Sequence, residues 1–134
     1  MIDTVVTWQV IGVGEVAIAD HRGSQPNVDQ ISALASECRV GGMLAGKAGL
    51  LYCHVGTSPR MLDILRQCVQ ETDIPITTFL PTHMERNEAL INEGAKWLRD
   101  GGYVDLTCRS IKAQVHSTLT SFLLYTCAVY KRSV

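Results

Sequence analysis

Short apolar runs alternate along this chain with segments of helical periodicity. The runs with strand character are 5–13, 50–54, 76–80 and 103–107. Between them, apolar residues recur at helical spacing in three segments, which begin after Ser24, Ser58 and Asn87. Such alternation predicts parallel strands joined by right-handed crossovers. The chain is therefore expected to be an α/β protein with the order βαβαβαβ.

Two architectures share this order, an open doubly wound sheet and a (β/α)8 barrel. A complete barrel needs roughly 200 residues or more, and 134 residues supply only about half of one. In both architectures the carboxyl ends of the parallel strands share one edge, where ligands and chemistry collect. Side chains that follow the predicted strands are therefore the first candidates for a functional site.

Three ionisable side chains stand at predicted strand ends. Glu15 follows the first run, His54 ends the second and His83 follows the third. An isolated histidine at a strand end is usually a hydrogen-bonded structural residue. Two histidines and a carboxylate at equivalent positions are harder to explain by chance, and they form a ligand set suited to a divalent metal ion. We therefore expect Glu15, His54 and His83 to converge on one metal site.

Composition excludes several classes of protein. The chain is 46% hydrophobic and 19% charged, which predicts a globular domain. A net charge of −1 without long runs of one sign argues against a nucleic-acid partner and a polybasic membrane anchor. The apolar segment 122–130 is shorter than the roughly 20 residues of a membrane-spanning helix. Five scattered cysteines without a C-x-x-C pair predict reduced thiols and a cytoplasmic protein.

A second reading starts from Gly12-x-Gly14-x-x-Ala17, which formally matches a dinucleotide-binding fingerprint. In that motif a helix begins within the fingerprint and presents its N-terminus to the pyrophosphate. Here the sequence after Ala17 runs into a polar loop at 21–26 instead. A small α/β nucleotide-binding module that uses the Gly12-x-Gly14 turn remains the alternative to the metal site.

Several local strings resemble those of the bacterial isoaspartyl (beta-aspartyl) dipeptidases. They occur in order over about residues 5 to 107, at 15–22, 24–26, 39–42, 46–49, 73–76, 79–83 and 86–87. That family belongs to the amidohydrolase superfamily of binuclear-metal (β/α)8 hydrolases. The resemblance implies a partial TIM barrel that covers about strands 4 to 7.

The resemblance also implies roles for individual residues. His54 and His83 fall where the family keeps the metal histidines of strands five and six. Glu15 falls at the end of strand four, where many members carry a carboxylated lysine that bridges two zinc ions. Arg22 and Arg86 match family arginines that hold the carboxylates of the dipeptide, a task suited to the fork of a guanidinium.

The implied activity is hydrolysis of isoaspartyl dipeptides by metal-activated water at a binuclear Zn²⁺ site. The family's H-x-H metal motif is expected before Met1 and its catalytic aspartate beyond Thr107, so no catalytic residue is assigned here; Asp105 is not that aspartate. We therefore expect residues 1–108 to be a fragment of the barrel that is inactive alone. Residues 109–134 diverge and could be frameshifted. The complete enzyme is expected to be a homo-oligomer.

Overall fold

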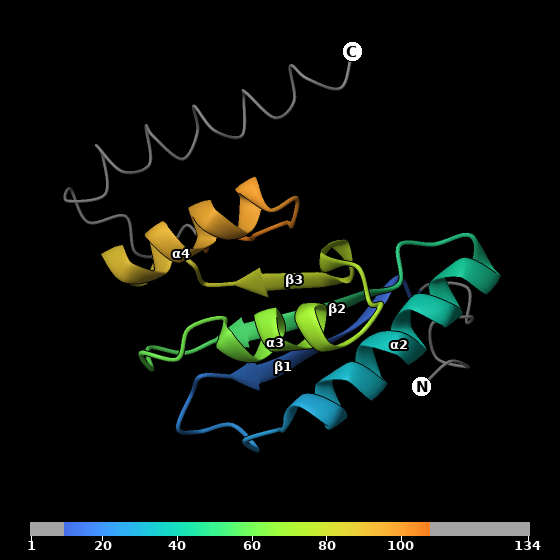
Figure 1. Cartoon of the computed structure of the whole chain (residues 1–134), viewed down its shortest axis with the longest axis horizontal. Coiled ribbons are helices and arrows are strands. Elements are labelled where there is room, and N and C mark those ends of the chain that lie inside the picture. The colour runs from blue at the N-terminus through green and yellow to red at the C-terminus, as the bar shows by residue number, and fades with distance from the viewer. Residues whose placement is uncertain (1–9, 108–134) are drawn as a thin grey trace, which may run out of the picture.

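A computed structural model describes residues 10–107 of the chain. The predictions for residues 1–9 and for the divergent tail 109–134 lie outside the described residues. The elements follow in the order β1 (Gly12–Ile18), α2 (Val28–Ala45), β2 (Leu50–Val55), α3 (Asp63–Glu71), η1 (Ile76–Thr78), β3 (Phe79–Thr82) and α4 (Glu88–Arg99). The three strands form one parallel sheet in the order β1-β2-β3, with β2 in the middle (Figure 1). The predicted α/β class is confirmed, while the assignment to strands 4 to 7 of a barrel stays a prediction.

The two faces of the sheet differ, and β2 shows this most clearly. Leu51, Cys53 and Val55 are fully buried in the core, to which α2 and α3 also contribute. Tyr52 and His54 alternate with them and lie partly buried on the opposite face. A continuous apolar run such as 50–54 is typical of a strand buried on both faces, but only one face of β2 is fully buried. The other face is the one that carries polar side chains.

Helix α2 begins and ends at capping residues. The Asn27 side chain accepts a hydrogen bond from the backbone of Gln30, and the Gln30 side chain accepts one from the backbone of Asn27. This reciprocal pair is a capping box, which fixes the start of the helix three residues after the expected Ser24. Gly46 ends the helix with φ 64°, a left-handed conformation that favours glycine.

Gly41 and Gly42 lie inside α2. A Cβ atom on Gly42 would lie 2.6 Å from the Cα atom of Gly49, at the entrance to β2. The absence of a side chain therefore lets α2 pack closely against the start of the central strand.

Three predicted boundaries are wrong. The first strand, predicted over 5–13, ends at Ile18. Helix α3 begins at Asp63 and not at Ser58-Pro59, which lie in a turn. The segment 76–78 forms a 3₁₀ turn after Pro75, so β3 runs over Phe79–Thr82 and not 76–80. As a result His83 follows directly after the last residue of β3.

The predicted fourth strand at 103–107 is not formed as a strand in the described part of the chain. The segment nevertheless lies beside β3, because the Asp105 backbone N–H donates to the Pro81 carbonyl at 2.9 Å and the Met84 N–H donates to the Asp105 carbonyl. Two such bonds hold the segment without completing a ladder.

Helices α3 and α4 are tied together through one arginine. Arg66 donates from Nε to Glu93 and from Nη1 to Asp100 at 2.8 Å, and its guanidinium lies 5.5 Å from the ring centroid of Trp97. Trp97 is fully buried and meets Phe79 of β3 edge-on. Charge pairing and aromatic packing therefore both fix α4 beside β3.

The described cysteines are free thiols. Cys38, Cys53 and Cys68 are all buried, and burial raises the pKa of the Cys53 thiol to about 12. Among the helices of residues 10–107, none combines the length and the apolar character that a membrane span requires.

Candidate metal centre

Glu15 lies inside β1, at an irregularity of the strand, and not after its end as predicted. The pairing of β1 with β2 shifts register between Val13 and Val16. Gly14 has φ 148°, and a Cβ atom there would lie 2.2 Å from the carbonyl oxygen of Tyr52. Only glycine fits such an approach, so Gly14 permits the bulge. The bulge brings Glu15 beside His54 of the neighbouring strand.

The structure brings Glu15, His54 and His83 together, as the sequence predicted. One ligand atom from each lies within 4.8 Å of the other two. His54 Nδ1 is 2.9 Å from Glu15 Oε2, and His83 Nε2 is 3.8 Å from Glu15 Oε1. The two imidazole rings meet edge-on with their centroids 4.5 Å apart. Each oxygen of the carboxylate therefore faces one imidazole nitrogen.

This donor set fits a divalent cation. Ligands about 2.0–2.2 Å from a tetrahedral zinc ion lie about 3.3–3.6 Å from one another, and the distances between these ligand atoms bracket that range. Two imidazoles and a carboxylate suit zinc and neighbouring transition metals. Glu15 would be able to bridge two ions, since both of its oxygens face the cluster.

Asp20 contacts the His54 ring and is shielded from solvent. Its side chain is only 3% exposed, and its Oδ2 atom is 3.2 Å from His54 Nε2. Arg22 donates to the two oxygens of Asp20 from Nε at 3.0 Å and from Nη2 at 2.6 Å. These side-chain bonds, and to a smaller extent a bond from the Arg22 backbone N–H, hold the pKa of the Asp20 carboxyl well below its usual range. A permanent negative charge therefore stands beside one nitrogen of His54.

Both predicted substrate arginines meet at Asp20. Arg22 forms the fork just described and is 65% exposed at its side chain. Arg86 is more enclosed, at 25%, with Nη1 4.0 Å from Asp20 Oδ2 and Nη2 3.3 Å from His54 Nε2. Arg22 uses one edge of its guanidinium for Asp20, so the other edge remains for a second carboxylate. Substrate binding by either arginine stays a prediction.

His83 has a different environment from His54. Its backbone φ is 67°, a left-handed conformation that is uncommon outside glycine and is often found at functional sites. Its Nδ1 atom is 2.6 Å from the Thr107 hydroxyl, which leaves Nε2 toward Glu15. Burial, followed by the charge of Arg86, lowers the pKa of the His83 imidazole and favours its neutral, metal-binding form.

A second polar network, not predicted from the sequence, lies next to the cluster. The hydroxyls of Tyr52 and Thr82 both donate to Asp105 Oδ2, at 2.7 Å and 2.5 Å. Tyr52 precedes His54 by two positions on the same face of β2, and Thr82 immediately precedes His83. The network therefore ties β2, β3 and the segment 103–107 together beside both histidines.

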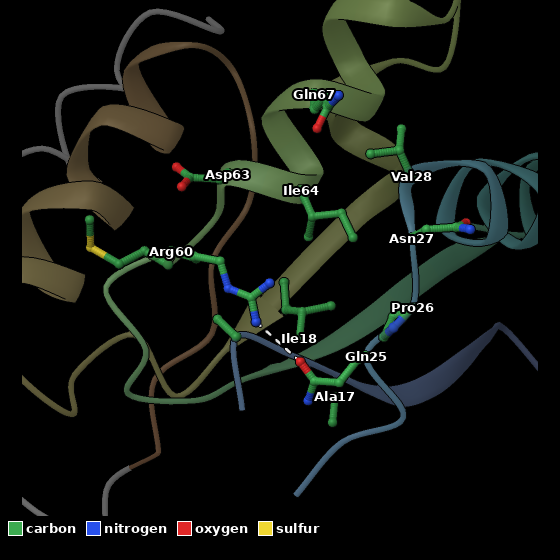
Figure 2. Close-up of a pocket in the computed structure, with 12 residues that line it drawn as sticks. Ala17, Ile18, Gln25, Pro26, Asn27, Val28, Arg60, Asp63, Ile64 and Gln67 are labelled. Atoms are coloured by element: carbon green, nitrogen blue, oxygen red, sulfur yellow. Dashed lines mark hydrogen bonds between the residues drawn. The ribbon is translucent and has the colours of Figure 1, made fainter. Parts of the chain in front are cut away.

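A separate pocket of about 400 Å³ lies between the loop after β1 and the start of α3 (Figure 2). Arg60 Nη2 donates to Gln25 Oε1 across it at 3.1 Å. Ala19, Gln25 and Met61 line it with positive φ angles of 49°, 53° and 40°. Glu15, His54 and His83 are not among the residues that line this pocket.

The local structure around Gly12 and Gly14 contradicts the alternative prediction of a nucleotide-binding module. Gly12 and Gly14 lie inside a β-strand, and the next helix begins only at Val28. No helix N-terminus follows the glycines, so they cannot present one to a pyrophosphate.

Comparison with known proteins gives a consistent picture, although no family model matches the chain. A crystal structure of the beta-aspartyl dipeptidase from the keratin-degrading thermophile Fervidobacterium islandicum AW-1 is similar with a TM-score of 0.76 at 42% identity, over 78% of this chain and 29% of that one. The same enzyme in complex with the dipeptide beta-Asp-Leu is similar with a TM-score of 0.76 at 43% identity, over 79% of this chain and 29% of that one. The chain is therefore related to the beta-aspartyl dipeptidases, and it spans about 29% of the length of the Fervidobacterium islandicum enzyme.

Proposed function

We propose that this chain carries part of the active site of a metal-dependent beta-aspartyl dipeptidase, with Glu15, His54 and His83 as ligands of Zn²⁺. The observation that carries the proposal is the convergence of these three side chains, whose ligand atoms lie within 4.8 Å of one another. The similarity to an enzyme solved with beta-Asp-Leu supports the same substrate class. In the complete site two zinc ions are expected, and Glu15 would be one of the residues that hold them.

The substrate is expected to be held by its charges. An isoaspartyl dipeptide carries an α-carboxylate on each residue, and its scissile amide links the side-chain carboxyl of aspartate to the next residue. Arg22 and Arg86 lie beside the metal ligands and can pair with these carboxylates. Bound divalent cations supply an activated water and polarise the scissile carbonyl. The arginines would then position the amide over the cluster.

The 134 residues contain four histidines and no H-x-H string. The described residues accordingly offer one group of three metal ligands. We propose that the chain alone does not hydrolyse beta-aspartyl dipeptides, since the described residues offer one group of possible ligands and the resemblance assigns no general acid or base to them. Loss of such a group alone typically lowers the catalytic rate by about 10²- to 10⁴-fold.

The buried, unpaired thiols of Cys38, Cys53 and Cys68 fit a reducing compartment, so a cytoplasmic location remains our expectation. Self-association of the complete enzyme also remains a prediction.

A chimera tests the function directly. Residues 10–107 would replace the equivalent segment of the Fervidobacterium islandicum enzyme, which supplies the remainder of the fold. We expect the chimera to release aspartate from beta-Asp-Leu, to lose this activity with a chelator and to regain it with Zn²⁺. The same chimera with Glu15→Gln should be inactive, while Glu93→Gln, which affects a carboxylate paired with Arg66 outside the cluster, should be active. A folded chimera without activity, or one in which Glu15→Gln changes nothing, would contradict the proposal.

A further inference from the structure

We propose that Asp20 is a positioning residue, whose buried carboxylate orients the His54 ring so that Nε2 carries the proton and Nδ1 is left to bind the cation. The inference rests on the proposed metal-dependent function, because it assigns a supporting residue to that same site. It adds Asp20 to the three ligands and gives the residue a role toward His54 that is separate from its pairing with the arginines.

The two nitrogens of His54 face two carboxylates. Nδ1 lies 2.9 Å from Glu15 Oε2, and Nε2 lies 3.2 Å from Asp20 Oδ2. A neutral imidazole carries a single N–H and can donate to only one of them. If Nε2 donates to Asp20, the lone pair of Nδ1 points toward Glu15, where a cation would be shared between them. Metal-binding histidines usually donate their second N–H to such a partner.

The opposite arrangement is also conceivable in this structure. With the proton on Nδ1, the ring would donate to Glu15, and Nε2 could accept from Arg86 Nη2 at 3.3 Å. Asp20 disfavours that form because an ionised carboxylate can only accept hydrogen bonds, so it would face the lone pair of Nε2. The Nε2–H form sets the Nδ1 lone pair against Glu15 in the same way until a cation binds there. The Glu15 side chain is 39% exposed and that of Asp20 only 3%, so water screens the repulsion from Glu15 better than the repulsion from Asp20.

Asp20 is itself held in place on several sides. Arg22 binds both carboxylate oxygens, and its backbone N–H donates to Oδ1 at 2.9 Å. The Gln25 side chain donates to the Asp20 carbonyl at 2.6 Å. The turn after β2 packs against the same residue, since a Cβ atom on Gly56 would lie 2.6 Å from Asp20 Cβ. A carboxylate fixed in this way can fix the ring that it contacts.

The first test is zinc affinity, measured on the 134-residue chain by competition with a chromogenic chelator. Asp20→Ala should weaken zinc binding roughly 10- to 100-fold, the usual effect of losing a partner of a metal histidine. Asp20→Asn keeps an acceptor oxygen of the same shape and should fall between the wild type and Asp20→Ala. Glu93→Gln is the matched control, since Glu93 is another buried carboxylate paired with an arginine but lies on α4 with Arg66 as its partner. Unchanged affinity in Asp20→Ala would overturn the proposal.

The second test does not require metal. ¹⁵N NMR of the metal-free chain, recorded at a pH at which the His54 ring carries one proton, reports which ring nitrogen holds it. The His54 signal is identified by its loss in His54→Gln. We expect the Nε2–H form in the wild type and a shift toward Nδ1–H in Asp20→Ala.

The two tests separate the two claims. An Nδ1–H ring in the wild type would overturn the role of Asp20 whether or not zinc binds. Absence of zinc binding together with the predicted shift of the ring proton would instead overturn the proposed metal site and leave the positioning role standing. If Asp20→Ala does not fold, the wild-type tautomer and Asp20→Asn still decide.

Discussion

His54 Nδ1 lies 2.9 Å from Glu15 Oε2, although the two residues are 39 positions apart and belong to different strands. The contact depends on the parallel register, in which Ala17 lies opposite His54, and on the bulge that interrupts β1 before Val16. Side chains from neighbouring strands can keep such a distance only if the strands and the loops that follow them stay in place. Substitutions that move those loops should therefore change the geometry of the site.

Gly56→Ala is expected to disturb the site from the turn after β2. The new Cβ atom would lie 2.3 Å from the Ala19 carbonyl oxygen and 2.6 Å from Asp20 Cα, so the loop that carries Asp20 must move. We expect a loss of roughly 1–3 kcal/mol in unfolding free energy, as for other overpacked positions, and weaker zinc binding. Urea unfolding and zinc titration measure the two effects.

Gly46→Ala is the control for that variant. Gly46 has φ 64° at the end of α2, and a Cβ atom there would meet nothing within 4 Å. Its left-handed backbone should cost about 1–2 kcal/mol in stability without any change in zinc affinity. Equal zinc affinity in Gly56→Ala and Gly46→Ala would contradict the predicted coupling between the turn and the site.

Arg86→Met should weaken catalysis by the active chimera. In the active chimera we expect it to raise KM or lower kcat/KM by roughly 10- to 1000-fold, the range for losing a charge-assisted bidentate contact. Its melting temperature should change little. Unchanged kinetics for beta-Asp-Leu would remove Arg86 from substrate binding.

Arg22→Met should differ from Arg86→Met in its effect on stability. The sequence places Arg22 in a solvated loop, but the structure gives it an intramolecular partner in the buried carboxylate of Asp20. We therefore expect the variant to lower both kcat/KM and the melting temperature, because Asp20 would lose its main ion pair. A lower melting temperature with normal kinetics would show that Arg22 is structural only.

Asp105→Asn should make stability less dependent on pH. Burial would raise the pKa of Asp105, but hydrogen bonds from Thr82 and Tyr52 outweigh it, so the folded-state pKa lies below its ordinary value of 3.8. Stabilisation by a carboxyl of lowered pKa is complete above that value and is lost as the pH falls through the folded-state pKa. At pH 7 the variant should lose about 1–2 kcal/mol of unfolding free energy.

Urea unfolding at pH 7, 5 and 3 measures this effect. The difference between wild type and Asp105→Asn should be constant from pH 7 to 5 and should begin to shrink toward pH 3. Asp73→Asn, at an exposed position outside the network, is the control and should show no such change. A difference in unfolding free energy that grows as the pH falls would contradict the lowered pKa of Asp105.

The sequence predicted those parts of the structure that depend on local patterns. Apolar runs identified β2 correctly, and Asn87 caps α4 as predicted, with its side chain accepting from the Leu90 backbone at 2.9 Å. The convergence of His54 and His83 followed from a general property of parallel sheets, the common edge of their carboxyl ends, whereas Glu15 reaches them from inside β1 through the bulge. That property holds even where a predicted boundary is shifted by a few residues.

Features that depend on tertiary contacts were not predicted. The bulge at Glu15 requires the close approach of Gly14 to Tyr52, which no local pattern records. The burial of Asp20 depends on a loop that turns back through Ala19, a residue with φ 49° and no sequence signal for that conformation. The hydrogen bonds to Asp105 depend on the position of the segment 103–107 beside β3.

The central claim is that Glu15, His54 and His83 together bind a divalent cation. X-ray absorption at the zinc edge of the zinc-loaded chain tests it most directly, since it identifies the ligand atoms. The account predicts saturable uptake of zinc, nitrogen and oxygen ligands at about 2.0–2.2 Å, and outer-shell scattering from imidazole that is reduced in His54→Gln and in His83→Gln. A sulfur ligand at about 2.3 Å, a spectrum unchanged by both substitutions, or no saturable uptake would contradict it.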